Sequence, residues 1–460
     1  MPVFPAEDLA TWCRGTWVGT PPPKATGIST DTRSLKPGDI FFALRGKNRD
    51  GHCFVDEAFG KGAAAVVVAR GVGEVQSPGG PRLVVDDTRE ALLQAAAGYR
   101  RRLGTRIVGI TGSVGKSTVK EMVAQMAATL VPVTSSPGNW NNEIGLPLSL
   151  LAMEPEAKMG VFEVATNHPG EIATLSNVLR PDCGVVTTVG PVHIEFFGSE
   201  EAIAREKAQL LAHVPSDGLA VVNRDMPFLE IFRQAFSGRF VTVSTADPEA
   251  DYFSPAVDSV RRTISIREKE SGQEVCVPYP QPGLHNARNV LLAAAVARQL
   301  GVTWAGITTA MRQFRPLPMR WQEMTIGGFC LINDAYNANP LSMRAAIETF
   351  WEETRPGKKW LVLGEMFELG QWSEQAHEEL GRFIAGKTWA GLVVVGPLGR
   401  LIAKGARCAG MAVDRIHECA GTKETADFIQ KYVPKGDSIL LKASRGVGLE
   451  KVVEHLASGY

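Results

Sequence analysis

The chain has 460 residues, of which 44% are hydrophobic and 21% charged, and 49 basic side chains balance 49 acidic ones. This length predicts two to four domains, and the balanced charge, without a basic tail, disfavours a nucleic-acid partner. The seven cysteines are scattered and form no CxxC pair, which indicates reduced thiols and argues against a structural zinc site.

The N-terminal stretch MPVFPAEDLA lacks the basic and apolar segments of a secretory signal. No apolar run approaches the roughly 18 residues that a membrane-spanning helix requires. We therefore expect a cytoplasmic protein without a membrane span, which acts as a monomer on small-molecule partners.

The first two segments of the chain alternate short apolar runs with helical patterns. In the first, strands are predicted at residues 39–44, 64–69 and 83–85, with a helix from about Thr88 to Leu103. In the second, the predicted elements are a strand at residues 106–110, a helix from near Ser117, strands at 161–164 and 184–189, and a helix from near Asn286 that ends before Gly301.

Two prolines in FRPLPM, residues 314–319, interrupt the pattern and predict a domain boundary. Beyond it, strands are expected at residues 329–333, 360–363, 392–395 and 438–442. Alternation with helices favours a parallel sheet covered on both faces. The predicted fold class is α/β in three domains: a small N-terminal α/β domain (1–104), a central parallel-sheet domain (105–317) and a C-terminal Rossmann-like α/β domain (318–460).

The sequence TGSVGKST at residues 111–118 lies between a predicted strand and a predicted helix, the context that a phosphate-binding loop requires. Glycines let main-chain N–H groups face anionic oxygens, and the helix N-terminus adds a positive dipole end. Lys116 can reach the β- and γ-phosphates, and the Ser117 hydroxyl can bind Mg²⁺. Ile110 stands where the longer GxxxxGK[ST] pattern has glycine, so the match is to a shorter variant.

This loop makes the central domain one of P-loop ATPase type, and we predict that all eight of its residues contact the nucleotide. Alone it predicts nucleotide phosphate binding without separating a ligase from a kinase, a GTPase or a transport ATPase. A turn that happens to contain glycine and lysine is the plain alternative. The predicted contacts are Thr111, Gly112, Ser113, Val114, Gly115, Lys116, Ser117 and Thr118.

Motifs along nearly the whole chain resemble those of the Mur ligases and occur in that family's order. DAYNANP together with GEMFELG resembles the member that adds D-alanyl-D-alanine, and the DNPR motif of the preceding ligase is absent from the sequence. The motifs are STDTR (29–33) with LKPGDIFFALRGKNRDGH (35–52), NWNNEIGLP (139–147), FEVATNHPGEI (162–172), VGPVHIEFFGS (189–199), HNARN (285–289), DAYNANP (334–340), GEMFELG (364–370) and KASR (442–445).

The resemblance implies an ATP-dependent ligase of peptidoglycan precursor synthesis. ATP would phosphorylate the terminal carboxylate of UDP-N-acetylmuramoyl-tripeptide, and the amine of D-alanyl-D-alanine would then displace phosphate. Two like charges about 4 Å apart repel by about 4 kcal/mol at an effective dielectric near 20, so cations must neutralise them. Lys116 and Mg²⁺ would serve that need.

The resemblance also implies the catalytic residues: Lys116, Glu163, His193 and Lys207. Ser117 and Glu163 would hold one Mg²⁺, and His193 with a carbamylated Lys207 would hold a second. Carbamylation requires a neutral amine, which burial can supply. A solvated lysine is nevertheless ordinary on a helix rich in Glu and Arg, and structural roles remain open for Glu163 and His193. Thr188 and the pair Ala208–Gln209 depart from the family's usual Asn and Gly-Glu.

The remaining implied contacts divide between nucleotide and substrate. The third domain would close onto the second to complete the site and expel water. For ATP they are Asn289, Arg320, Asp334 and Asn337; for the UDP end Ser29, Thr30, Asp31, Arg33, Asn48 and His52; for the other substrate groups Asn141, Asn142 and Asn339.

Three alternatives stay open from the sequence. A Mur ligase could use a different amine donor. A P-loop regulatory NTPase would hydrolyse nucleotide without any amine acceptor. A non-enzymatic scaffold would leave Lys116, Ser117 and Glu163 unexplained.

Overall fold

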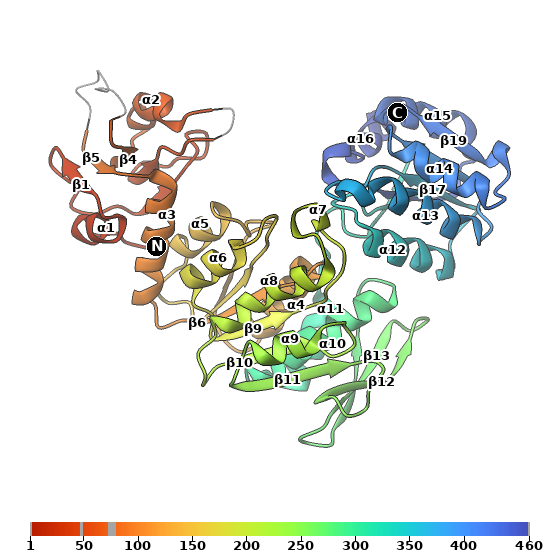
Figure 1. The fold of residues 1–460 in the computed structure, drawn as a ribbon, viewed down its shortest axis with the longest axis horizontal. Helices are drawn as coiled ribbons and strands as arrows, with labels where there is room; N and C mark the ends of the chain where they lie inside the picture. The colour runs from red at the N-terminus through yellow and green to blue at the C-terminus, as the bar shows by residue number, and fades with distance from the viewer. Residues whose placement is uncertain (1, 47–48, 72–79, 459–460) are drawn as a thin grey trace.

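The computed structural model describes residues 2–46, 49–71 and 80–458, and it contains three sheets that succeed one another along the chain (Figure 1). Across the described residues, no helix is both long and apolar enough to traverse a bilayer.

The N-terminal sheet has the strand order β1-β5-β4-β3-β2, with β1 antiparallel to its neighbour and the other pairs parallel. Every residue of β3 and β4 is buried, as expected for parallel strands covered on both faces. The elements are α1 (Ala6–Cys13), β1 (Thr16–Val18), β2 (Gly27–Ser29), β3 (Asp39–Phe42), a 3₁₀ turn (Gly51–Phe54), α2 (Val55–Gly60), β4 (Ala65–Ala69), β5 (Arg82–Val85) and α3 (Thr88–Arg102).

The central sheet has nine strands in the order β14-β13-β12-β11-β10-β9-β6-β8-β7, and its neighbours are parallel except that β13 is antiparallel to both β12 and β14. Its elements up to β9 are β6 (Arg106–Thr111), α4 (Lys116–Ala127), β7 (Val133–Ser135), α5 (Gly145–Leu151), β8 (Met159–Glu163), α6 (Glu171–Leu179) and β9 (Cys183–Val186). Then follow α7 (Ile194–Phe197), α8 (Glu200–Ala212), β10 (Leu219–Asn223), α9 (Leu229–Gln234), β11 (Arg239–Ser244), β12 (Tyr252–Asp258), β13 (Thr263–Glu268), β14 (Glu274–Pro278), α10 (Leu284–Gln299) and α11 (Trp304–Gln313).

The position of β6 between β8 and β9 locates the site. All three strands are parallel, so their carboxyl ends meet at one edge of the sheet. Open α/β sheets bind ligands at the carboxyl ends of their strands, at the point where the strand order reverses. Here β6 marks that point, because the following strands β8 and β9 lie on opposite sides of it. The phosphate-loop segment begins where β6 ends, and Glu163 is the last residue of β8.

The C-terminal sheet has the order β15-β16-β20-β17-β18-β19, with helices on both faces. The expected strands are present, but an antiparallel edge strand, β15, joins the predicted parallel set. Its elements are β15 (Gln322–Ile326), β16 (Phe329–Asn333), α12 (Pro340–Glu352), β17 (Lys359–Leu363), a 3₁₀ turn (Gly370–Trp372), α13 (Ser373–Ala385), β18 (Gly391–Val395), α14 (Gly399–Cys408), a 3₁₀ turn (Val413–Arg415), β19 (Ile416–Cys419), α15 (Thr422–Tyr432), β20 (Ser438–Lys442), a 3₁₀ turn (Arg445–Val447) and α16 (Glu450–Ser458).

The hydrophobic core is continuous between the central and C-terminal domains. Buried residues of α8 and β10 belong to the same cluster as buried residues of α12 and β17. The C-terminal domain lies beside the central one, on the far side from the N-terminal domain (Figure 1). Residues of both domains can therefore face one cavity.

The strand expected at residues 184–189 is shorter than predicted, because β9 ends at Val186. The next residues turn against the phosphate loop: Thr187 donates from its hydroxyl to the carbonyl of Val114, 2.6 Å away, and the carbonyl of Thr188 accepts from the Ser113 N–H. These contacts replace the ladder that would have continued the strand.

Candidate active site

The phosphate loop has a backbone that only glycine fits at two positions. Gly112 and Gly115 have φ angles of 149° and 87°, in the region that L side chains rarely adopt. A Cβ on Gly115 would lie 2.7 Å from Oδ1 of Asn289, and one on Gly112 would collide with the Thr187 hydroxyl. Ile110 is fully buried in β6, so the missing first glycine of the longer motif is a core residue here.

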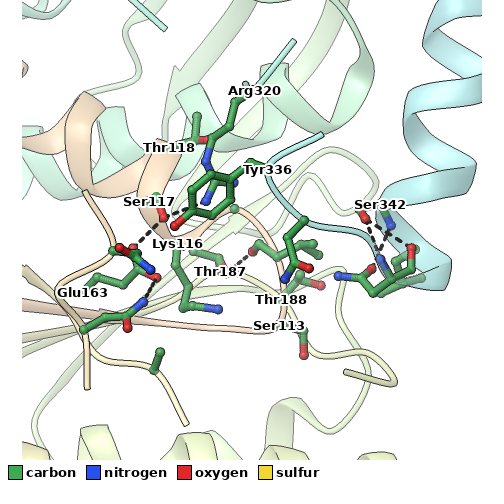
Figure 2. Close-up of a pocket in the computed structure, with 18 of the residues that line it drawn as sticks. Ser113, Lys116, Ser117, Thr118, Glu163, Thr187, Thr188, Arg320, Tyr336 and Ser342 are labelled. Atoms are coloured by element: carbon green, nitrogen blue, oxygen red, sulfur yellow. Dashed lines mark hydrogen bonds between the residues drawn. The ribbon is translucent and has the colours of Figure 1, made fainter. Parts of the chain in front are cut away.

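Ser117 and Glu163 meet at the floor of the site, as Figure 2 shows. The Ser117 hydroxyl donates to Oε2 of Glu163 over 2.6 Å, and Nδ2 of Asn141 donates to Oε1 over 2.8 Å. Glu163 is only 2% exposed, so its ionised carboxylate requires such partners. One hydroxyl and one carboxylate side by side are the hard oxygen ligands that Mg²⁺ prefers. The residues present therefore fit the first predicted metal site.

Lys116 and Arg320 supply positive charge at the same place. Nζ of Lys116 donates to the carbonyl of Gly112 over 2.8 Å, and Nη2 of Arg320 donates to the Ser117 hydroxyl over 3.0 Å. Desolvation lowers the pKa of Lys116, the carboxylate of Glu163 opposes that change, and Arg320 adds to it. Arg320 also lies over the ring of Tyr336, 4.3 Å from its centroid (Figure 2), which holds the guanidinium in place.

A third cation, Lys442, fixes the predicted nucleotide contact Asp334. Nζ of Lys442 lies 2.6 Å from Oδ2 of Asp334 and also donates to the carbonyls of Asp334 and Asn337. Oδ1 of Asp334 accepts from the Trp321 N–H at 3.1 Å. Asp334 therefore presents a charge-paired carboxylate at the end of β16.

A cavity of about 1090 Å³ extends over this floor and is walled by residues of the central and C-terminal domains, with Arg89 of α3 at its N-terminal side. It is large enough for a nucleotide and a second substrate together. Thr111, Gly112 and Lys207 do not line the cavity. The predicted residues that do line it are 113–118, Asn141, Asn142, Glu163, His193, Asn289, Arg320, Asp334, Asn337 and Asn339.

Of the residues predicted for the second metal, His193 lines the cavity and Lys207 does not. Nδ1 of His193 lies 2.6 Å from Oε2 of Glu368 in the C-terminal domain, and this contact lowers the pKa of the Glu368 carboxyl. Lys207 is 3% exposed rather than solvated, and burial, with the nearby charge of Lys116, lowers its pKa to about 7 while Glu206 opposes that change. Among the described residues, no group of three His, Cys, Asp or Glu side chains could hold a metal.

Glu206, the neighbour of Lys207, has a structural role. Its two carboxylate oxygens accept from the N–H groups of Gly170 and Ile172, each over 2.9 Å. A carboxylate at this position accepts hydrogen bonds from N–H groups that have no partner within α6, and its negative charge is stabilised by the positive end of the helix dipole.

Two of the predicted substrate asparagines also bond to main-chain N–H groups at the start of helices. Oδ1 of Asn142 accepts at 2.9 Å from the N–H of Gly145, the first residue of α5, and Asn339 is the N-cap of α12, where it forms a reciprocal capping box with Ser342. These bonds hold both side chains at the cavity wall. Asn337 accepts from the N–H of Ala338.

The residues predicted for the UDP end lie in the N-terminal domain, outside this cavity. Asp31 forms an exposed ion pair with Arg33, which lowers the pKa of Asp31 to about 2, and Ser29 closes a turn with the Asp31 carbonyl. Thr30 lies in the same turn at the end of β2. His52 is buried, with Nδ1 2.5 Å from Asp50 and Nε2 accepting from the Ala69 N–H. Neither of its nitrogens is free for a ligand. Asn48 lies outside the described residues.

Sequence reasoning did not assign Lys442, Glu368 or Tyr336, although each lies in a quoted motif. It also left out His285, whose ring is desolvated so that its pKa falls to about 4. For Lys442 the sequence offered one signal: it is a lysine at the end of the largely apolar strand SILLK, where a charged side chain is unusual.

Comparison with known proteins gives matches over almost the whole chain. Residues 24–100 match the Mur ligase family catalytic domain, residues 110–297 the Mur ligase middle domain, and residues 319–445 the Mur ligase glutamate ligase domain. The UDP-N-acetylmuramoyl-tripeptide–D-alanyl-D-alanine ligases of Bacillus subtilis and Escherichia coli are 36% and 32% identical to it. The alignments cover 94% and 93% of this chain, and 93% of each relative.

Two solved structures show the same arrangement. A crystal structure of MurF from Acinetobacter baumannii matches with a TM-score of 0.89 at 29% identity, covering 99% of both chains. That of MurF ligase from Thermotoga maritima in complex with ADP matches with a TM-score of 0.81 at 28% identity, covering 94% of this chain and 97% of the other. By sequence and by fold, this chain belongs to the Mur ligase family.

Proposed function

We propose that this chain is the ATP-dependent ligase that joins D-alanyl-D-alanine to UDP-N-acetylmuramoyl-tripeptide in cytoplasmic peptidoglycan precursor synthesis. The main observation behind the proposal is that both domains line one and the same cavity. In it, Lys116, Ser117 and Glu163 of the central domain face Arg320 and Asp334 of the C-terminal domain. Relatives that cover the chain end to end are named for that reaction.

The chemistry requires one anion to attack another. A carboxylate oxygen of the tripeptide bonds to the γ-phosphorus of ATP, the bridge to ADP breaks, and an acyl phosphate forms. Lys116 and Arg320 neutralise the charge that crowds together in this step. The amine nitrogen of D-alanyl-D-alanine then bonds to the acyl carbon, inorganic phosphate leaves, and the amine loses a proton.

Ser117 and Glu163 would hold Mg²⁺, which supplies further neutralisation of phosphate oxygens when bound. His193 and a carbamylated Lys207 would hold a second ion. Residues 111–118, Asn289, Asp334 and Asn337 would bind ATP, the last two from the C-terminal domain. The Arg320–Ser117 bond supports this arrangement because it joins the start of the C-terminal domain to the phosphate loop.

The other predicted contacts concern UDP-N-acetylmuramoyl-tripeptide and D-alanyl-D-alanine. Ser29, Thr30, Asp31, Arg33 and Asn48 would bind the UDP end, and His52 would support that site through its bonds to Asp50 and Ala69. Asn141, Asn142 and Asn339 would line the path of the peptide. We retain domain boundaries after residues 104 and 317 as part of the proposal, and a monomer as the working unit.

A two-substrate assay tests the proposal. ADP release is expected only when both UDP-N-acetylmuramoyl-tripeptide and D-alanyl-D-alanine are present, and Lys116→Ala should abolish it with unchanged circular dichroism. Equal turnover with another amine would reassign the donor, and ADP release without any amine would favour a regulatory NTPase.

A further inference from the structure

Lys120 is a fully buried lysine that the proposed reaction does not use. It lies one helical turn after Lys116 in α4, its side chain is 0% exposed, and it is among the largest fully buried side chains of the described residues. Lysine is almost never buried completely without partners. Its surroundings should therefore explain its presence.

The Lys120 ammonium is occupied by three oxygens. It donates to the carbonyl of Ser136 and, over 3.3 Å, to that of Gly138, and it lies 2.8 Å from Oε1 of Glu121. An ammonium has three donors and no acceptor, so its capacity is filled. Two of the three partners are main-chain carbonyls of the segment 136–142, which we call the asparagine loop.

The asparagine loop connects β7 to α5 without regular structure and passes along the cavity. Asn141, near its end, donates to Oε1 of Glu163 at 2.8 Å, and the Asn141 carbonyl accepts from the Ala165 N–H. At its start, the Ser136 hydroxyl accepts from the Glu163 N–H at 3.5 Å. The loop therefore contacts the Glu163 carboxylate and its main chain.

We propose that Lys120 is a positioning residue, which fixes the asparagine loop so that Asn141 orients the Glu163 carboxylate for Mg²⁺. Lys120 and Ser117 belong to the same helix, so the helix that carries one predicted metal ligand also holds the loop that orients the other. The inference rests on the proposed function, because it takes Glu163 as a metal ligand.

The decisive quantity is the gain in nucleotide affinity that Mg²⁺ provides. Titration calorimetry would measure binding of an ATP analogue with a non-hydrolysable β–γ bridge, once with Mg²⁺ and once with EDTA. Lys120→Met should reduce the Mg²⁺-dependent gain about tenfold, because the unsatisfied carbonyls let the loop shift. Its affinity in EDTA should stay within about twofold of wild type, since the phosphate loop is intact.

Two further variants separate positioning from general stability. Asn141→Ala should reproduce the loss, and adding it to Lys120→Met should change the gain by less than about twofold, because both act through one path. Lys359→Met is the matched control: Lys359 also donates to two carbonyls, those of Trp351 and Glu353, but in the C-terminal domain outside the cavity lining. It should lower the melting temperature without changing the Mg²⁺ gain.

The outcomes are distinct. A Lys120→Met protein with the wild-type Mg²⁺ gain, or with equal losses in Mg²⁺ and EDTA, overturns the inference and leaves the proposed function intact. Wild-type protein without any Mg²⁺ gain overturns the metal role of Glu163 and the inference together. If Lys120→Met does not fold, Asn141→Ala decides alone, because it removes the bond to Glu163 through which Lys120 is proposed to act, and a wild-type Mg²⁺ gain in that variant is the contradicting result.

Discussion

The carbamylation of Lys207 gives the most demanding prediction, because it depends on a pKa. Burial and the charge of Lys116 lower the pKa of this lysine from 10.5 to about 7. At pH 7.5 about three-quarters of the amine is then neutral, against about 0.1% at the ordinary value, a ratio of roughly 750. Only the neutral amine can attack CO₂, so the site should carbamylate at physiological pH.

The sign of the pH dependence follows from the same shift. The neutral amine persists above pH 7 and is lost as the pH falls through about 7, so activity that requires the carbamate should fall there too. CO₂-depleted buffer should lower ligation at least about tenfold at pH 7.5, since the unmodified amine lacks the carboxylate oxygens with which a carbamate would bind Mg²⁺, and bicarbonate should restore it.

Carbon NMR with ¹³C-bicarbonate reports the modification directly. Wild-type protein should show a carbamate signal that Lys207→Met lacks and Lys359→Met retains. The reasoning is refuted if the signal is absent from wild type, or if Lys207→Met ligates at the wild-type rate in either buffer.

Three further substitutions test the cavity floor and the nucleotide contacts. Glu163→Gln should lower kcat/KM by about 10²–10³-fold, and steady-state kinetics that show less than a tenfold loss would contradict its metal role. Gly115→Ala should weaken ADP binding by about tenfold, because its Cβ meets Asn289 and its φ is positive; calorimetry that gives wild-type affinity would exclude this steric account. Lys442→Met leaves the Asp334 carboxylate without its partner, and removing one member of such a pair costs about 3–5 kcal/mol. Scanning calorimetry should show a lower melting temperature for Lys442→Met, and steady-state kinetics should show a raised KM for ATP. An unchanged KM would mean that Lys442 contributes to stability but not to nucleotide binding.

The phosphate loop could be placed from sequence because its signal is local. A strand, two glycines, a lysine and an apolar helix face lie within 22 residues (106–127), and α4 begins one residue before the expected Ser117. Strands such as β16 and β20 were predicted to the residue, since parallel strands buried on both faces are nearly continuous apolar runs.

The contacts that complete the site could not be predicted in this way. Ser117 and Arg320 are 203 residues apart, and Lys442 and Asp334 are 108 apart. No periodicity specifies such pairings: the first arises from the packing of two domains, and the second from the pairing of β16 with β20 within one domain. Glu368 and His193 likewise meet only because the 3₁₀ turn Gly370–Trp372 of the C-terminal domain packs on α7.

The sequence analysis also missed the antiparallel strand pairs β12–β13 and β13–β14 at one edge of the central sheet. Residues 263–268 alternate in burial along β13, and TISIRE shows that alternation in its letters. The strand was missed because the surrounding pattern favoured only parallel units. His52 shows the opposite problem: its motif matched a ligand position, whereas its ring atoms bond within the domain.

The central claim is that this cavity lets ATP activate a carboxylate, and isotope transfer tests it most directly. UDP-N-acetylmuramoyl-tripeptide with ¹⁸O in its terminal carboxylate would be turned over with ATP and D-alanyl-D-alanine, and the released phosphate analysed by mass spectrometry. One ¹⁸O per phosphate is expected, because the attacking oxygen leaves with phosphorus. Phosphate without label, formed alongside ligated product, would contradict the acyl phosphate and the role assigned to the site.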